Sequence, residues 1–397
     1  MRNFRFRSPT QIIFGKGAES KIGKTLADGG YKRVLLLYGQ QSAIRSGLLD
    51  RLGDSLTEAG LWHTTYGGVE ANPKVQFVRE AIPFVKEENI DFICAVGGGS
   101  VIDAAKAIAV GVKSDIDVWE MIEKQITPTQ RVAIGSVLTL ASAGSETSIS
   151  MVLTNTDNNL KRSLNVNMLQ PEYAFMNPEL TFSVGAYQTG CGIVDTMMHT
   201  LERYCSSEGI TPLTDRLAEG ILLSVIEAGE VVMKDPHDYE GRSTLMWASS
   251  LSHNGLTGLG RGGIYFAAHK IEHDLSGVYD HIAHGAGLSV LFPAWALFMV
   301  EHDPSRFAQL AHRVWNVEYN EESDEKHIAK EGIVKMRRFF KSLGMPTTMD
   351  DLKVPQHMYT PLANMTTANN MKPLDSLIAL TTEMIVEIYH LANIPVE

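Results

Sequence analysis

The first half of the chain alternates short apolar runs with amphipathic stretches. Apolar runs bounded by turn residues predict buried strands at 33–39, 62–69, 91–100 and 131–139. Helical periodicity predicts helices at 46–60, at 73–89 with a disturbance at Pro83, and from Val101 onward. Strands that alternate with helices in this way predict an α/β domain with a mostly parallel sheet covered on both faces.

The pattern of apolar residues changes near Thr181. After this point helical periodicity dominates and strand-like runs become rare. The length of 397 residues exceeds the size of one ordinary core and also favours two domains. The sequence therefore predicts an α/β domain over 1–183 and an all-helical domain over 184–397. The charged stretch 318–332 is typical of a solvated loop and an exposed helix face.

The composition of the chain limits the classes of partner and the compartments that we expect for it. The net charge of −11 argues against nucleic acid, because proteins that bind phosphate backbones present basic surfaces. The sequence has no apolar run of about 18 residues, so we expect no membrane span. Residues 1–15 lack the apolar stretch of a secretory signal. Three cysteines without a short CxxC pair indicate free thiols in a reducing compartment, which predicts the cytoplasm.

A glycine-rich turn joins a predicted strand to a predicted helix in AVGGGSVIDAAKA (95–107). Glycines let the backbone approach an anion, and the helix start supplies free N–H groups, so Gly98, Gly99 and Ser100 suit a pyrophosphate. The usual GxGxxG dinucleotide fingerprint is absent. The alternative is a tight turn in which Ser100 caps the helix and Asp103 completes a capping box. A capped helix would still present these residues to a ligand.

The end of the strand at 33–39 bears on the choice of nucleotide. Sites that prefer NAD often place Asp or Glu there, on the ribose 2′-hydroxyl. This chain has Gly39, followed by polar residues and by Arg45, and its next acidic residue is Asp50. A carboxylate would repel a 2′-phosphate, so the sequence favours NADP(H) over NAD(H), against the alternative of a plain polar loop.

Four side chains in the second half form a candidate metal shell. Asp195 and His199 are four residues apart in a predicted helix, so they project from one face. His269 and His284 follow in AAHKIEHDLSGVYDHIAHGAG. Three imidazoles and one carboxylate suit Fe(II), Zn(II) or a similar divalent ion. Each of these residues taken alone is more typical of a structural role, but their apolar surroundings require partners for them.

A rival motif overlaps this set. His269 to His273 reads H-x-x-E-H, the signature of inverted zinc peptidases, with Glu272 as the general base. Short motifs match by chance often. A peptidase would explain neither the glycine turn nor the Asp195–His199 pair.

Together these motifs resemble the iron-containing, metal-dependent alcohol dehydrogenases. GGGSVIDAAK, GSETS, the DxxxH pair, HxxxH and HGxGxxxxxP occur in the family's order over nearly the whole chain. VLTLASAGSE, HKIEHDLS and Gly39 point to the NADPH-dependent butanol dehydrogenases and broad aldehyde reductases within it. The resemblance implies a Rossmann-like nucleotide-binding domain, an all-helical metal-binding domain, a dehydroquinate synthase-like architecture with the active site in the cleft, and a homodimer.

The resemblance also implies roles for single residues. The implied metal ligands are Asp195, His199, His269 and His284. His273 would act beside the nicotinamide as a proton carrier. The implied cofactor contacts are Gly98, Gly99 and Ser100 at the pyrophosphate with Asp103 nearby, Thr139 and Ser145 in the cofactor cleft, and Gly39 and Ser42 at the adenosine ribose.

The chain departs from the family pattern in places. It reads LTLASAGSE where many members read PTTxGTGSE, and it has Asn177 where many have Asp. The stretch after His273 is one residue longer than in some members, which leaves His281 as an alternative to His284; the HG pair and the later proline favour His284.

The implied function is reversible hydride transfer between NADP(H) and a short to medium aliphatic alcohol or aldehyde, such as butanol or butanal. No arginine cluster indicates a phosphorylated or carboxylated substrate. A dehydroquinate synthase-like lyase would need such a basic pocket. A glycerol dehydrogenase-like enzyme and a binding protein with a purely structural metal stay open as well.

Overall fold

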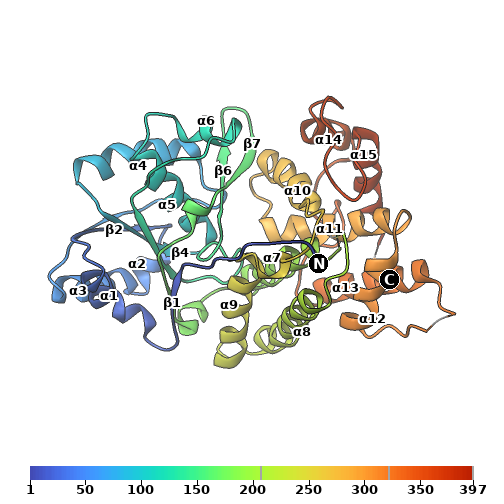
Figure 1. Cartoon of the computed structure of the whole chain (residues 1–397), viewed down its shortest axis with the longest axis horizontal. Coiled ribbons are helices and arrows are strands. Elements are labelled where there is room, and N and C mark those ends of the chain that lie inside the picture. Colours follow the sequence, from blue (N-terminus) through green and yellow to red (C-terminus); the bar gives the residue numbers. More distant parts are fainter. Residues whose placement is uncertain (206–207, 321, 396–397) are drawn as a thin grey trace. The chain divides into compact units, whose positions relative to one another are not determined.

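A computed structural model describes residues 1–205, 208–320 and 322–395. The chain divides into two compact units, each made of more than one segment. The sheet unit comprises Arg7–Val184 and His237–Asn254, and the helical unit comprises Met1–Phe6, Gly185–Pro236 and Gly255–Glu397. Figure 1 colours the chain along its sequence, from the blue N-terminus to the red C-terminus.

The sheet unit is built on six strands in the order β1-β8-β5-β4-β2-β3. All five neighbouring pairs are parallel. The strands are β1 (Gln11–Phe14), β2 (Arg33–Tyr38), β3 (Trp62–Tyr66), β4 (Phe92–Gly97), β5 (Ala133–Leu138) and β8 (Tyr173–Met176). A separate antiparallel hairpin is formed by β6 (Ser150–Asn155) and β7 (Leu160–Asn165). The prediction of a parallel α/β domain is confirmed.

Alternate residues of the central strands enter two different cores. Leu35, Leu37 and Ile93 belong to one apolar cluster, whereas Val34 and Leu36 belong to another. Successive side chains of a strand point to opposite faces, so helices cover both faces of the sheet. One cluster includes residues of α4 (Val75–Glu87), α5 (Gly99–Gly111) and α6 (Val118–Glu123); the other includes residues of α1 (Ile22–Asp28), α2 (Ser42–Arg45) and α3 (Leu48–Glu58).

The strands predicted at 33–39, 62–69, 91–100 and 131–139 correspond to β2, β3, β4 and β5. Pro83 lies inside α4, which continues through it. The short strands β1 and β8 and the hairpin β6–β7 were not predicted. Within the described residues, Glu325 begins a helix that covers the second half of the charged stretch 318–332, and the preceding segment is loop.

The helical unit is arranged around α11 (His284–Val300), whose residues are apolar and buried almost all round. This helix packs against α7 (Ala186–Cys205), α10 (Ala267–Val278), α13 (Glu325–Ser342) and α15 (Thr382–Leu391). The unit is completed by α8 (Pro212–Lys234), α12 (Ser305–Trp315) and α14 (Tyr359–Thr367). The predicted helical character of the second half is confirmed. Within the described residues, none of the helices combines the length and apolarity that a membrane crossing would require.

One helix of the second half, α9 (Tyr239–His253), belongs to the sheet unit. It packs against the 3-10 helix η3 (Pro178–Thr181), and its Met246 lies in the sheet unit's apolar core. Conversely, the N-terminal segment Met1–Phe6 belongs to the helical unit. The backbone N–H of Arg2 donates to the Gly260 carbonyl of that unit at 2.9 Å. The division 1–183 and 184–397 stays a prediction about consecutive domains, whereas the compact units are interleaved along the chain.

Candidate metal and nucleotide sites

The face of α7 that turns into the helical unit carries three polar side chains. Asp195, His199 and Glu202 are four and three residues apart, which is the spacing of one helix face. All three are buried. Apolar neighbours on the same helix, Met197 and Met198, are buried as well. A sequence that buries polar groups at helical spacing among methionines must satisfy them inside the unit.

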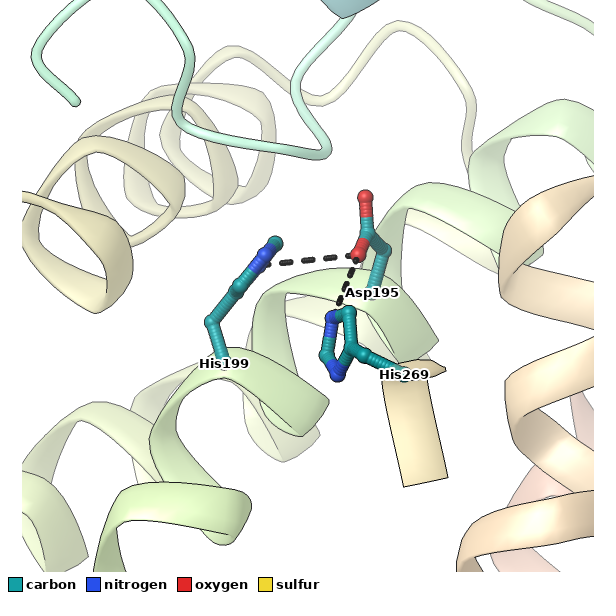
Figure 2. Close-up of side chains that lie close together, drawn as sticks. All are labelled: Asp195, His199 and His269. Atoms are coloured by element: carbon teal, nitrogen blue, oxygen red, sulfur yellow. Dashed lines mark ion pairs between the residues drawn. The ribbon is translucent and has the colours of Figure 1, made fainter. Parts of the chain in front are cut away.

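Two further histidines reach this face from other helices. His269 is the third residue of α10 and His284 is the first residue of α11. The distances to Asp195 Oδ1 are 3.5 Å from His199 Nδ1, 3.9 Å from His269 Nε2 and 3.9 Å from His284 Nε2. Figure 2 shows Asp195, His199 and His269 pointing toward one another, with dashed lines along the first two of these distances.

These separations fit ligands around one ion better than direct hydrogen bonds. Nitrogen-to-oxygen hydrogen bonds are about 2.7–3.2 Å long. Ligands bonded to a tetrahedral metal at about 2.1 Å lie about 3.4 Å from each other. The donor atoms of Asp195, His199 and His269 form a group within 4.8 Å of one another. His284 adds a third imidazole at a similar distance from the same carboxylate oxygen.

Two glutamates contact the Nδ1 atoms of two of these imidazoles, whose Nε2 atoms lie near Asp195. Glu202 Oε1 lies 3.3 Å from His269 Nδ1 and also accepts the backbone N–H of His269 at 2.9 Å. Glu272 Oε2 makes a close contact with His284 Nδ1. Because a carboxylate only accepts, each Nδ1 is the donor, and each Nε2 keeps its lone pair for the position near Asp195.

The charge of the group supports the same interpretation. The side chains of Asp195, Glu202 and Glu272 are at most 3 % exposed. The buried Arg203 guanidinium interacts electrostatically with Glu202, and a bound divalent cation would offset the negative charge of the other two carboxylates in this low-dielectric interior. Donor types, spacing and charge therefore fit a divalent transition metal.

His273 lies at the edge of this group. Its ring centroid is 5.4 Å from that of His284 and 6.5 Å from that of His269. His273, Glu272 and His284 form a second set of donor atoms within 4.8 Å of one another. His281, the alternative to His284, has its ring 6.0 Å from Tyr279 and belongs to neither group of donors found among the described residues.

Phe266 encloses the group where α10 begins. It precedes the helix in the left-handed conformation, with φ of 52°, which is unusual for a bulky residue. Its ring lies 5.2 Å from the ring of His269 and 6.2 Å from that of His199. The Arg203 guanidinium lies 4.7 Å from its centre on another side. Phe266 thus places an apolar wall beside two of the imidazoles.

The glycine turn lies in the sheet unit, between β4 and α5. Gly98 is the N-cap of α5, without a side-chain hydrogen bond, and Ser100 lies inside the helix. The alternative in which Ser100 caps the helix and Asp103 completes a capping box is therefore wrong. A Cβ at Gly98 would lie 3.1 Å from Leu140 Cβ, and one at Gly99 would lie 3.0 Å from Ala143 Cβ. Glycine avoids a tight contact with the next loop, and the helix start keeps backbone N–H groups for an anion.

Asp103 and Ser145 point into the interior of the sheet unit. The Ser145 hydroxyl donates to Asp103 Oδ1 at 2.5 Å, and the backbone N–H of Val152 donates to Asp103 Oδ2 at 3.0 Å. Lys106, which is fully buried, donates to Ser145 Oγ at 2.9 Å and to the Ser150 carbonyl at 2.6 Å. Burial lowers the pKa of Lys106 to about 8, while Asp103 and Glu146 oppose that shift.

Lys106 is a residue that the sequence analysis missed. Its signal is its position seven residues after Gly99 in a helix that is otherwise apolar, because a lysine there needs buried acceptors. Glu202 and Glu272 were also missed as supports of the histidines. Glu202 continues the Asp195–His199 face by one more turn, which is a readable signal, whereas the partner of Glu272 depends on the packing of α10 on α11.

The remaining predicted cofactor residues follow the strands. Gly39 comes directly after β2, Ser42 begins α2, and Thr139 comes directly after β5, where its N–H donates to the Gly97 carbonyl at 3.1 Å. Strands β5, β4 and β2 are adjacent and parallel, so their carboxyl ends share one edge of the sheet. Nucleotides bind at such edges in open α/β sheets.

The sequence matches the iron-containing alcohol dehydrogenase family over residues 9–178 and the C-terminal region of the Fe-containing alcohol dehydrogenase family over residues 189–393. It is 36 % identical over 390 residues to NADH-dependent butanol dehydrogenase A of Clostridium acetobutylicum, covering 98 % of this chain and 99 % of that protein. It is 35 % identical over 358 residues to the NADPH-dependent aldehyde reductase YqhD of Escherichia coli, covering 88 % and 89 %.

A solved structure matches the fold of this chain over nearly its full length. The structure of NADH-dependent butanol dehydrogenase A from Thermotoga maritima superimposes with a TM-score of 0.95. The two sequences are 32 % identical, and the match covers 99 % of each chain.

Proposed function

The chain belongs to the iron-containing alcohol dehydrogenase family, and we propose from that membership that it interconverts short to medium aliphatic aldehydes and alcohols with NADP(H). The family makes it an NAD(P)-dependent oxidoreductase acting on CH–OH groups. Butanal and butanol are the proposed representative pair, in line with the relatives named as butanol dehydrogenases and aldehyde reductase.

The observation that carries the proposal is the convergence of three imidazole nitrogens on Asp195 Oδ1. Asp195, His199, His269 and His284 would hold one divalent ion, Fe(II) or Zn(II). Bound there, the ion would supply Lewis-acid chemistry to the substrate oxygen on which negative charge develops. The same donor set argues against the H-x-x-E-H peptidase, because Glu272 is engaged with His284 and Asp195 supplies the carboxylate.

The protein's own residues supply positioning and proton movement in this proposal. Gly98, Gly99 and Ser100 would hold the pyrophosphate at the start of α5, with Asp103 and Lys106 fixing the loop beside it. His273, half-buried beside His284, would carry the alcohol proton between substrate and solvent through its ring nitrogens. The dihydronicotinamide supplies the hydride when an aldehyde is reduced.

The choice of NADP(H) rests on Gly39. Its φ is not positive, and a Cβ there would lie 3.4 Å from the Val69 carbonyl oxygen and 3.7 Å from Val101 Cγ2. These are ordinary contacts, so the backbone does not demand glycine at this position. A position that tolerates a side chain but lacks a carboxylate favours the 2′-phosphate of NADP(H).

The proposal includes a homodimer in the cytoplasm. All three cysteines, Cys94, Cys191 and Cys205, are free and buried, which suits a reducing compartment. Sedimentation at micromolar concentration should give twice the mass of 43.7 kDa calculated from the sequence. A measured mass equal to that of one chain would contradict the proposed dimer but would not affect the proposed reaction.

The decisive experiment measures NADPH absorbance with butanal on protein stripped by a chelator and then supplied separately with Fe(II) or Zn(II), with NADH in parallel. We expect metal-restored consumption of NADPH and weak consumption of NADH. Restored activity with NADH alone would overturn only the cofactor choice. No consumption with either cofactor under any metal would reject the proposed function and favour a lyase or a binding protein.

Gly39→Asp separates cofactor choice from catalysis. The added carboxylate should lower kcat/KM for NADPH and leave kcat/KM for NADH unchanged or raised, because it repels only the 2′-phosphate. Gly39→Ala is the matched control, since it adds the same Cβ without charge. Equal losses in both variants would mean that the side chain, and not its charge, disturbs the site.

A further inference from the structure

The contact between Glu272 and His284 joins two helices behind the candidate metal group. Glu272 lies on α10 and its side chain is fully buried, whereas His284 begins α11 and its side chain is 24 % exposed. The other two imidazoles of the group, His199 and His269, are only 7 % and 8 % exposed. His284 is thus the imidazole of the group most open to solvent, and it stands at the first position of α11.

A glycine makes room for the Glu272 carboxylate. Gly287 lies one helical turn after His284, and a Cβ there would lie 2.7 Å from Glu272 Cγ and 2.9 Å from Glu272 Oε1. Gly285 serves a different contact, because its Cβ would meet the backbone of Cys191 on α7. The HGAG segment therefore combines close helix packing with a space shaped for one buried carboxylate.

We propose that Glu272 is a positioning residue that retains the metal by holding the His284 ring, with Nε2 directed at Asp195. The inference rests on the proposed metal centre and deepens it. Hydrogen bonding of Nδ1 to a carboxylate fixes the tautomer and the ring orientation of a metal-binding histidine and increases its basicity. At the most exposed ligand, loss of that support opens the route by which the ion leaves.

Glu202 serves as an internal comparison. Glu202 Oε1 takes the backbone N–H of His269 as well as its Nδ1, so a change there also disturbs the first turn of α10. In the contact between Glu272 and His284, both partners are side-chain atoms. Variants of Glu272 therefore act on the imidazole itself, which makes them the cleaner test of metal retention.

The experiment loads the full chain with Co(II), whose visible spectrum reports coordination, and measures release into excess chelator. Wild type should bind one ion per chain. Glu272→Gln keeps the shape but loses the charge, and we expect release to be about tenfold faster; Glu272→Ala should approach a hundredfold. Gly287→Ala keeps the carboxylate but displaces it, so it should also speed release.

Two controls separate the possible failures. Glu219→Gln removes a buried carboxylate of the same unit that pairs with Arg216, Arg313 and Tyr204, so it should change stability and leave release unchanged. Thermal unfolding of the metal-free variants shows which of them fold. Unchanged release in folded Glu272→Gln and Gly287→Ala would overturn the inference and leave the proposed function intact.

The stoichiometry of the wild type is the remaining discriminator. Binding of two ions per chain would overturn the inference, because Glu272, His273 and His284 would then be ligands of a second ion. Absence of any bound ion would instead reject the metal centre of the proposed function.

Discussion

The two units bury polar clusters of opposite character. In the sheet unit, the Lys106 ammonium, Asp103 and Ser145 form a network in which donors meet acceptors at hydrogen-bond distance. In the helical unit, the nitrogens of three histidines stand 3.5–3.9 Å from Asp195 Oδ1. The first network is complete with protein groups alone, whereas the second has the spacing and the excess of carboxylates that a cation completes.

The difference shows how a buried polar group can be assigned to structure or to ligand binding. Both clusters are buried, so burial alone does not separate them. Charge balance does: the Lys106 ammonium donates hydrogen bonds at 2.6–3.3 Å and lies 4.0 Å from Asp103 Oδ1, so the sheet-unit network holds its own cation, whereas the group around Asp195 is one that a bound ion would balance. Each of the following measurements tests one side of this contrast.

The largest effect is expected from Lys106→Met. It removes the cation beside the partly buried Asp103 and the buried Glu146, which should lower the free energy of unfolding by about 3–5 kcal/mol in urea denaturation. Metal content should not change. Lys124→Met, in an exposed pair with Glu120, is the control and should leave the free energy of unfolding nearly unchanged. A similar small cost for Lys106→Met would show that the network is not a closed ion pair.

The next effect is that of Asp195→Asn. Loss of the central ligand should lower kcat/KM by about 10²- to 10³-fold and abolish tight metal binding. The metal-free variant should be more stable than metal-free wild type, because it has one buried negative charge fewer. Thermal unfolding of both metal-free proteins measures this. A less stable variant would mean that the cluster is balanced without an ion.

A third test uses pH on a balanced cluster of the helical unit. Burial alone would raise the pKa of Asp215, but Arg306 and Arg261 lower it to about 2, below the usual 3.8. A lowered carboxyl pKa stabilises the fold above the usual value, and this contribution is lost as pH falls from about 4 to about 2. The loss should be about 2 kcal/mol in wild type and absent from Asp215→Asn. An unchanged slope in the variant would assign the acid sensitivity to another group.

The smallest effect is expected from His273→Gln. Removal of the proposed proton carrier should slow turnover about tenfold, at the low end of proton-transfer catalysis, with metal content unchanged. Metal analysis and steady-state kinetics on the same preparation measure both quantities. If the variant loses metal as well as activity, His273 is itself a metal ligand, and it joins Asp195 and the three other histidines in the metal site.

The sequence predicted the central strands because their signals are local. The runs at 33–38 and 92–97 are largely apolar and bounded by turns, and they form β2 and β4 in the structure. The short strands β1 and β8 have four residues each, too few for a period to be seen. The hairpin β6–β7 carries Lys161 and Arg162 among its apolar residues, which hides its alternation.

The site was predictable where spacing along one helix carries it. Asp195 and His199 are readable from α7 alone. The partner of Glu272 was not, because the H-x-x-E-H match suggested a different role, and only the packing of α11 on α10 brings His284 to it. The alternative with Ser100 as N-cap is wrong because α5 begins at Gly99 with Gly98 as its N-cap, so Ser100 already lies inside the helix.

The assignment of α9 to the sheet unit has a consequence for biosynthesis. The sheet's strands are all made by Met176, but Met246, which joins the same core, is made 70 residues later, after α7 and α8. A ribosome that has reached Val184 has therefore polymerised every strand of the sheet, with part of the covering still to be synthesised. The sheet unit is complete only when synthesis reaches Asn254, and truncation at a single peptide bond cannot release either unit whole.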